Sequence, residues 1–353
     1  MALLGALLAG VAPPAGAGEP PARDQRGAPL PASLPAHKMV TFNSALWMLL
    51  TLDQGTDRVA GASASTVRVV TTGLLGKAFP QAARVPDTVA ADGFFLPNVE
   101  AILALAPDAV LQWVGRNDPA YLAPLERAGL PVVGLRENQS DADYIATARL
   151  LGTLSGQPGR AEALVERYQA LYAALARDLA SLVGERRPKV LYLWKDRPLI
   201  PIGGGSFYGA LLERSGGENA AASLSRWGAV TMEQILVWNP DVVLLFCCGP
   251  ARPQALYEDP AWRAVRAVRE RRVYKVPMGG SRFADLIEGP LFSRWLAELL
   301  HPGLPSRLRQ DLRETYRAIY GLTLSDDDLD RTLHARANAL SAHYKRFLRE
   351  TPP

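Results

Sequence analysis

Short apolar runs alternate with helical patterns along most of the chain, which is typical of α/β architecture. Two series of apolar runs are separated by one long helical pattern, from Pro158 to Val183, in which apolar residues recur every three to four positions. At a rise of ~1.5 Å per residue this helix would be ~39 Å long, enough to bridge two domains. Strands are expected at 38–42, 67–71, 109–113 and 132–135, and in the second series at 189–194, 242–246 and 272–276.

An internal repeat supports two similar lobes. Residues 98–113 align without gaps with residues 231–246, and seven of the sixteen positions are identical. Each copy reads as an N-cap residue, a short helix, a Pro-Asp turn and a buried strand. The repeat is the strongest feature of the chain.

A helix that ends in Pro-Asp-Ala-Val (107–110) in one half and Pro-Asp-Val-Val (240–243) in the other resembles the periplasmic substrate-binding proteins of ABC importers. The closer resemblance is to the helical-backbone class that serves iron–siderophore, haem and cobalamin uptake, and it covers about residues 37–345. Further matching motifs lie at 57–61, 215–220, 272–280 and 295–302.

The resemblance implies an α/β fold of two rigid Rossmann-like lobes joined by a single long helix, with a shallow ligand cleft between the lobes. The expected divisions are a leader (1–35), an N-terminal lobe (36–155), a connecting helix (156–185) and a C-terminal lobe with terminal helices (186–353). It also implies a partner, the dimeric permease of an ABC importer with its ATPase, and a monomeric binding protein.

Glu100 and Glu233 occupy equivalent positions in the first turn of the two repeated helices. Each carboxylate could simply complement the positive end of its helix, which is worth ~0.3–1 kcal/mol. The resemblance implies a second role, because the matching glutamates of the family pair with arginines of the permease. Glu100 would then dock one lobe and Glu233 the other.

Loops at the carboxyl ends of the strands should line the cleft, as in open α/β sheets generally. Arginine suits carboxylate, catecholate or phosphate oxygens, and aromatic faces suit flat or apolar ligand parts, so the set favours an anionic metal chelate. A ferric siderophore is the favoured cargo, with haem, cobalamin and a molybdate-type oxyanion left open. The alternative is that the tryptophans are core and the arginines solvated surface. The expected ligand-binding residues are Trp47, Trp113, Arg116, Lys195, Tyr208, Arg226, Trp227, Met278, Arg282 and Phe283.

The composition of the chain argues against several other functions. The chain has 353 residues, 39 Lys and Arg against 35 Asp and Glu spread along it, and 48% hydrophobic residues, which argues against disorder and nucleic-acid binding. No intrinsic metal site or cofactor is expected, because the four histidines are dispersed and the two cysteines, Cys247 and Cys248, are adjacent. Without a nucleophile–base set or cofactor fingerprint, an enzyme on this fold is disfavoured; a ligand sensor is the other alternative. For haem, Tyr208, Tyr121 or Met278 could serve as the axial ligand.

The N-terminus indicates export. A short apolar run, Leu3 to Ala12, precedes the small residues 15–17, as in a signal peptide with its cleavage site. The Pro- and Ala-rich stretch from Glu19 to Pro35 reads as a disordered leader. A periplasmic protein is expected, without a lipid anchor because no cysteine follows residues 8–10. The free thiols of Cys247 and Cys248 would be unusual in such an oxidising compartment, and as small apolar residues at a strand end they need no chemical role.

Overall fold

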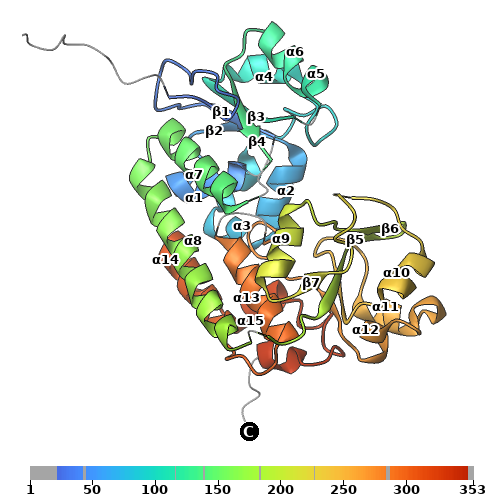
Figure 1. The fold of residues 1–353 in the computed structure, drawn as a ribbon. Helices are drawn as coiled ribbons and strands as arrows, with labels where there is room; N and C mark the ends of the chain where they lie inside the picture. Colours follow the sequence, from blue (N-terminus) through green and yellow to red (C-terminus); the bar gives the residue numbers. More distant parts are fainter. Residues whose placement is uncertain are drawn as a thin grey trace, which may run out of the picture.

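The computed structural model describes residues 22–348 except 43–44, 116, 138–139, 183, 226 and 284–286. Two sheets organise the chain, and we call the parts built around them the N-lobe and the C-lobe (Figure 1). The N-lobe sheet has the order β2-β1-β3-β4, all parallel, formed by Met39–Thr41 (β1), Val59–Ala62 (β2), Ala109–Val114 (β3) and Val132–Arg136 (β4). The C-lobe sheet has the order β6-β5-β8-β9 with β7 also beside β5, formed by Lys189–Asp196 (β5), Leu199–Pro201 (β6), Glu218–Asn219 (β7), Val242–Leu245 (β8) and Val273–Lys275 (β9).

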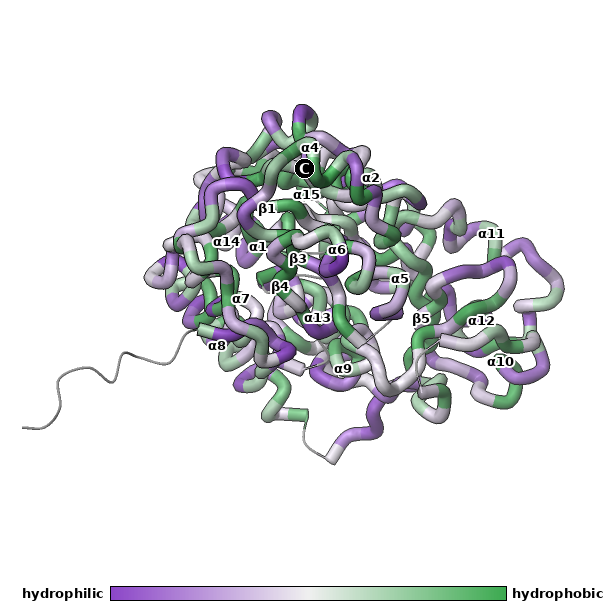
Figure 2. Tube along the Cα trace, turned by 90° about the horizontal axis from the view of Figure 1, so that it is seen from above, coloured by the Kyte–Doolittle hydropathy of each residue, from purple (hydrophilic) through white to green (hydrophobic). Residues whose placement is uncertain are grey.

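Helices cover both sheets, and hydrophobic segments follow the strands β3 and β5 while hydrophilic ones gather on the periphery (Figure 2). The N-lobe helices are Ala45–Asp53 (α1), Ala64–Thr72 (α2), Leu74–Ala78 (α3), Val99–Leu105 (α4), Asp118–Tyr121 (α5), Ala123–Arg127 (α6) and Asp141–Ser155 (α7). After the connecting helix Pro158–Leu179 (α8) come Phe207–Arg214 (α9), Met232–Trp238 (α10), Pro253–Glu258 (α11), Arg266–Arg269 (α12), Glu288–Leu300 (α13), Leu308–Tyr320 (α14) and Asp326–Thr332 (α15).

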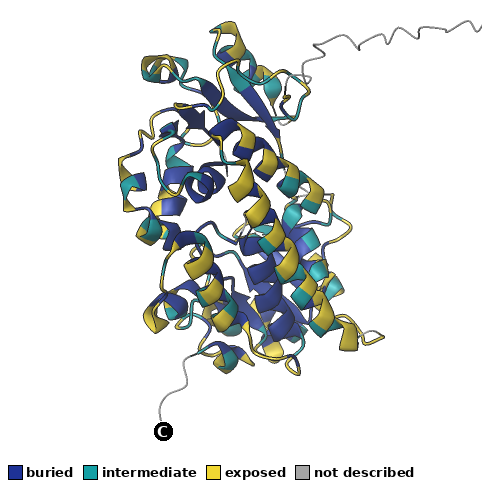
Figure 3. Ribbon diagram, turned by 90° about the vertical axis from the view of Figure 1, so that its left-hand side faces the viewer, coloured by how far each residue is buried: buried dark blue, intermediate teal, exposed yellow. Residues whose placement is uncertain are grey.

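The long connecting helix is confirmed. It begins at Pro158 and ends at Leu179, and a short 3-10 helix, Ala180–Leu182, extends it before Gly184 takes a positive φ of 93°. Its buried residues are Ala161, Leu164, Val165, Tyr168 and Leu175, which share one face. Figure 3 looks onto the side of the molecule along which α8 runs and shows exposed positions on the outward helix faces.

The repeat folds alike in both lobes. The side chains of Asn98 and Thr231 each accept a hydrogen bond from the backbone N–H three residues on, at 3.3 and 3.4 Å. The two helices, α4 and α10, then end on residues in the left-handed region, Ala106 (φ 47°) and Asn239 (φ 41°). Each Pro-Asp turn feeds the central strand of its sheet, β3 or β8. The chain therefore builds one unit twice, as the sequence predicts.

One expected strand is wrong. Residues 67–71 lie within the helix α2, and the strand beside β1 is β2, Val59–Ala62. The β-branched run suggested a strand, but Val67 and Val70 point into the core from one helical face. Tertiary packing overrides the local preference of β-branched residues here.

The segment 22–35 is not the disordered leader that its composition predicted. Asp24 is buried and accepts hydrogen bonds from the backbone N–H of Gly134 in β4 (2.7 Å) and of Ala28 (2.9 Å). Arg26 pairs with Asp24 at 2.8 Å and with Glu126 at 2.6 Å. Because a few specific polar contacts tie this segment to the N-lobe, Pro- and Ala-rich composition alone misjudged it. Residues 1–21 lie outside the described residues.

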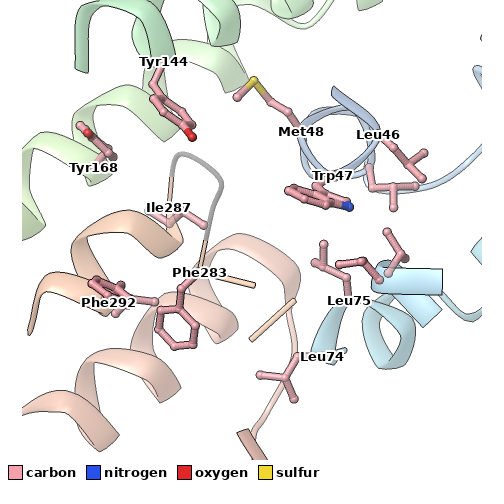
Figure 4. Close-up of a cluster of buried hydrophobic side chains, with 14 of the residues drawn as sticks. Leu46, Trp47, Met48, Leu74, Leu75, Tyr144, Tyr168, Phe283, Ile287 and Phe292 are labelled. Atoms are coloured by element: carbon pink, nitrogen blue, oxygen red, sulfur yellow. The ribbon is translucent and has the colours of Figure 1, made fainter. Parts of the chain in front are cut away.

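The two lobes share one hydrophobic core. Its largest cluster joins residues of α1 and α3 to residues of α8, α13 and α14, and Figure 4 shows Trp47 and Leu75 of the N-lobe on one side of this cluster, with Phe283 and Ile287 on the other. Polar contacts add to it, including the bond from Leu74 N–H to Gly279 O at 3.1 Å. The terminal helices α14 and α15 therefore form a second connection beside α8.

Asp241, in the Pro-Asp turn of the C-lobe, makes the stability dependent on pH. Burial opposes its charge, but hydrogen bonds from Arg186, the Lys189 amide and Arg266 outweigh burial and lower its pKa to about 2. A carboxyl whose folded pKa is depressed contributes stability above its unfolded pKa of ~3.9 and loses it as the pH falls. We expect Asp241→Asn to lower the free energy of unfolding by about 2 kcal/mol at pH 7.

Urea unfolding at several pH values checks this expectation. The difference between wild type and Asp241→Asn should shrink from pH 4 downward and nearly vanish by pH 2. The exposed Asp57→Asn is the control and should stay within about 0.5 kcal/mol of wild type. A difference that is independent of pH would contradict the ion-pair explanation.

Candidate ligand-binding site

Four aromatic residues gather around the carboxyl end of β5 in the C-lobe, and we call them the aromatic wall. Trp194 lies near the end of β5, and its ring centre is 3.8 Å from that of Phe246, which follows β8. Trp227 stands edge-on to Trp194 at 5.0 Å and is 41% exposed. Tyr208, in the first turn of α9, is 6.4 Å from Trp194. The wall therefore presents an aromatic surface to solvent at Trp227, supported by the half-buried rings of Trp194 and Phe246 and the buried ring of Tyr208.

The loop before α9 fixes Tyr208. Ser206 caps the helix, because its hydroxyl accepts from the Gly209 N–H at 3.1 Å and donates to Gly203 O at 2.8 Å. Burial raises the pKa of Tyr208 far above its usual value. Tyr208 is therefore a neutral phenol, and its ring packs edge-on against Tyr192 at 5.5 Å.

Arg282 brings a positive charge to the aromatic wall. Its guanidinium carbon lies 5.9 Å from the centre of the Phe246 ring, and its φ of 62° is in the left-handed region. The buried carboxylate of Glu288 holds this loop by accepting the backbone N–H groups of Gly280 (2.6 Å), Ser281 (2.8 Å) and Phe283 (3.1 Å). Three charge-assisted bonds to one carboxylate can stabilise the unusual backbone that aims Arg282.

Three sulfur atoms meet beside the wall, and we call Cys247, Cys248 and Met278 the sulfur group. The Sγ atoms of the cysteines lie 2.9 Å apart, and Cys248 Sγ lies 3.7 Å from Met278 Sδ. Cys247 is buried and Cys248 is exposed. Burial raises the pKa of Cys247, whereas the hydrogen bond from Cys247 lowers the pKa of Cys248, with the charges of Arg282 and Lys275 acting in the same direction.

Lys275 fixes the loop that follows the cysteines. Its ammonium donates to Gly249 O at 2.6 Å and to Ala251 O at 3.0 Å, although the residue is 1% exposed. Burial, reinforced by the charge of Arg252, lowers the pKa of Lys275 to about 8. A buried cation that spans β9 and this loop sets the position of Cys248 relative to Met278.

A second aromatic group, which the sequence reasoning missed, lies at the corresponding edge of the N-lobe sheet. Phe94 and Phe95 are adjacent, and Phe95 is 6.1 Å from Tyr121. The Gln112 side chain in β3 donates to Phe95 O at 2.9 Å, which ties this loop to the strand that carries Trp113. Phe94 is 55% exposed. An Asp-Gly turn followed by two phenylalanines was the available signal, because such turns present their neighbours at the surface.

A hollow of about 390 Å³ reaches between the lobes. It is bordered by Thr71 and Lys77 of the N-lobe and by Met278 and Asp328 on the opposite side. Lys77 and Asp328 pair across it at 2.6 Å. Met278 thus belongs both to this interlobe space and to the sulfur group.

The structure brings together four of the expected ligand-binding residues, Tyr208, Trp227, Met278 and Arg282. Lys195 follows Trp194 in β5 and is exposed to solvent. Trp113 lies at the end of β3 in the N-lobe and is nearly buried.

Four of the expected residues, Trp47, Trp113, Tyr208 and Phe283, are buried in the largest hydrophobic cluster. Phe283 has no exposed surface, and Trp47 is 7% exposed among the apolar side chains of Figure 4. A direct contact of Phe283 with cargo is therefore corrected to a packing role, because the Glu288-bound loop turns the ring inward. Arg116 and Arg226 lie outside the described residues.

Glu100 and Glu233 are both exposed, in the first turns of α4 and α10. Hydrogen bonds from the Thr231 hydroxyl and from its own backbone N–H lower the pKa of Glu233, so it is ionised at neutral pH. The apolar residues nearby are also exposed at equivalent positions of the repeat, Leu103 and Leu236. The structure leaves both carboxylates accessible to a partner.

Within the described part of the chain, no three His, Cys, Asp or Glu side chains form a group that could hold a metal ion. Among the same residues, no helix combines the length and apolar character needed to cross a membrane.

The fold and the strand-end site define a two-lobed binding protein, and comparison with known proteins agrees. Residues 43–278 match the periplasmic binding protein family, and the chain belongs to this family. It is of the helical-backbone class, whose lobes are joined by a long helix like α8.

Named relatives bind different small molecules. The chain is 32% identical over 150 residues to the vitamin B12-binding protein of Salmonella typhimurium, which covers 42% of this chain and 54% of that protein. It is 24% identical over 228 residues to the molybdate-binding protein MolA of Haemophilus influenzae, covering 58% and 64%. The chain thus spans about half the length of the vitamin B12-binding relative.

Among solved structures, a periplasmic solute-binding protein of Veillonella parvula is similar with a TM-score of 0.78 and 27% identity, covering 90% of this chain and 97% of that one. The likeness to MolA bound to molybdate, with a TM-score of 0.73 and 18% identity over 86% and 98%, shows the shared fold.

The sulfur group yields a prediction about thiol reactivity. Because the thiolate is the reacting form, iodoacetamide at pH 7 should modify Cys248 at least ~10-fold faster than Cys247. Time-resolved mass spectrometry with fragment ions distinguishes the two positions. Arg282→Gln should slow the modification of Cys248 at pH 7, because it removes a charge that favours the thiolate. Equal rates for both cysteines would contradict the described geometry.

Proposed function

We propose that this protein captures a metal chelate with a flat organic part and delivers it to the permease of an ABC importer. The aromatic wall carries the proposal, because Trp227 is 41% exposed and the guanidinium of Arg282 lies 5.9 Å from the Phe246 ring of the same wall. Aromatic faces suit flat or apolar ligand surfaces and the guanidinium suits anionic oxygens, so one site satisfies both halves of an anionic chelate. The exposed Phe94 of the N-lobe, beside the half-buried Phe95, supports a second aromatic surface for the same ligand.

The relatives widen the choice of cargo. Cobalamin moves to the front of a test panel because of the vitamin B12-binding relatives, and haem follows from solved haem-binding neighbours. The ferric siderophore that the sequence favoured stays a prediction and belongs in the same panel. A bare oxyanion such as molybdate gains nothing from an aromatic wall, although one relative binds it. In each case the bound molecule is cargo and not an intrinsic cofactor.

We place the protein in the periplasm, as a monomer that docks on a permease dimer associated with its ATPase. Family membership and the pair of equivalent, exposed glutamates support this arrangement. A relative of Bacillus subtilis is named a lipoprotein, so the mode of anchoring is a separate question. A sensor would bind the same cargo without driving uptake, and an enzyme would convert it.

Binding to the wall can be tested at Trp227. Titration calorimetry with cyanocobalamin, haemin, a ferric siderophore and molybdate should show saturation by one of the chelates. Trp227→Ala should then raise the Kd about tenfold, about 1.4 kcal/mol, whereas Trp227→Phe should preserve most of the affinity. The exposed Leu340→Ala, remote in the C-terminal segment, serves as the control and should leave the Kd unchanged. If none of these compounds binds in the calorimetric titrations, the proposal is overturned.

Docking can be tested by charge reversal. Glu100→Arg and Glu233→Arg should each reduce uptake roughly tenfold in cells that rely on this binding protein, because a cation would face the permease arginines. The Kd for cargo should not change, since both carboxylates are exposed in the first turns of α4 and α10 and neither residue belongs to the aromatic wall.

The matched control is Glu314→Arg on the exposed face of α14, which should transport like wild type. Normal uptake by both reversed variants would exclude these glutamates as docking groups. Loss of cargo binding in either variant would instead show that the substitution disturbed the lobe.

A further inference from the structure

The parallel register of two strands brings Cys248 and Met278 together. In the C-lobe sheet Val243 pairs with Val273 and Leu245 with Lys275, a constant offset of 30 residues. The same offset continued three residues beyond the strands places position 248 beside position 278. Neighbouring parallel strands lie about 4.8 Å apart, so side chains at matched positions on one face can touch. The contact of the two sulfur atoms is thus a consequence of the sheet.

The separation of the sulfur atoms suits a shared metal ion. Two sulfur ligands at ~2.3 Å from one tetrahedral metal lie about 3.8 Å apart, and Cys248 Sγ lies 3.7 Å from Met278 Sδ. The two cysteine sulfurs, at 2.9 Å, are too close for the same arrangement. Cys247 is instead buried and hydrogen-bonded to Cys248, and it is a positioning residue.

The ligand type and the surrounding charge narrow the class of metal. Thiolate and thioether sulfur select soft ions such as Cu(I) over hard ones. Arg282 and Lys275 stand near Cys248, so their positive charge disfavours a bare cation and suits a metal that arrives within an anionic chelate. Two protein ligands also leave the remaining coordination positions to a chelator.

We propose that Cys248 and Met278 form a soft-metal subsite of the ligand cleft, which takes two adjacent open positions on the metal of an anionic chelate. The subsite deepens the proposed function and rests on it only in treating this cleft as the place where cargo binds. The subsite separates the candidate cargoes into two groups. A macrocycle that surrounds its metal leaves no two adjacent coordination positions free, whereas an open chelate leaves such positions free for Cys248 and Met278.

The probe is cadmium nitrilotriacetate, an anionic complex of a soft ion in which the chelator leaves adjacent positions open. The purified protein is kept reduced with a phosphine, and a thiol titration confirms two free cysteines. Binding should produce an ultraviolet cadmium–thiolate band that saturates at one complex per protein. Cys248→Ser should abolish the band, and Met278→Leu should weaken binding at least ~10-fold.

Cys247→Ser and the control Met232→Leu should both retain the band. A band that survives Cys248→Ser, or no band at all, would overturn the subsite. A band abolished equally by Cys247→Ser would overturn it in favour of a site formed by the two thiols. Binding of free Cd²⁺ but not of the chelate would overturn the anionic class of cargo.

Cyanocobalamin, titrated in parallel into wild type and Cys248→Ser, separates this inference from the proposed function. If cyanocobalamin binds to saturation but no cadmium band appears, the proposed function is supported and the subsite is overturned. If the cadmium band appears but none of the chelates binds in the calorimetric titrations, the subsite is supported and the broader proposal is overturned.

Discussion

The shared hydrophobic core between the lobes is the constraint on which the rest of the structure depends. Most binding proteins of two lobes could in principle vary the angle between them, but here α1 and α3 of the N-lobe pack into the same core as α8, α13 and α14. Because protein interiors are close-packed, any hinge motion would have to open this core and expose Trp47 and Phe283. The core therefore sets the distance between the strand-end loops of the two sheets before any ligand arrives.

Within that frame, the chemistry depends on where parallel strands end. Trp194, Phe246, Cys248 and Met278 follow or close three neighbouring strands, so the sheet itself gathers residues that lie far apart in the sequence. Two buried charges then hold the loops, since Glu288 accepts the backbone of the Arg282 loop and Lys275 donates to the loop after Cys248. Buried ions that satisfy several backbone groups are rigid supports, because losing one partner would leave a charge uncompensated.

The sequence predicted the architecture well because the repeat and the long helix are periodic signals that local chemistry enforces. The N-caps Asn98 and Thr231 and the Pro-Asp turns specify the same unit in each lobe. The errors arise where tertiary contacts decide: residues 67–71 became helical against their β-branched composition, and Asp24 drew a Pro-rich segment onto β4. No local sequence pattern predicts a contact between residues that lie more than a hundred positions apart in the chain.

The site was predicted by position rather than by side-chain direction, and this explains its mixed outcome. Strand ends predict which loops come together, but a loop residue can point to solvent, as Trp227 does, or into the core, as Phe283 does. The sulfur group shows the same limit, since only the register of β8 and β9 pairs Cys248 with Met278. Cys248, which composition treated as a small apolar residue, thereby comes to lie beside a second sulfur atom next to the aromatic wall. In a parallel sheet, the register of neighbouring strands decides which residues at the strand ends come into contact. The spacing of these residues along the sequence alone does not reveal that contact.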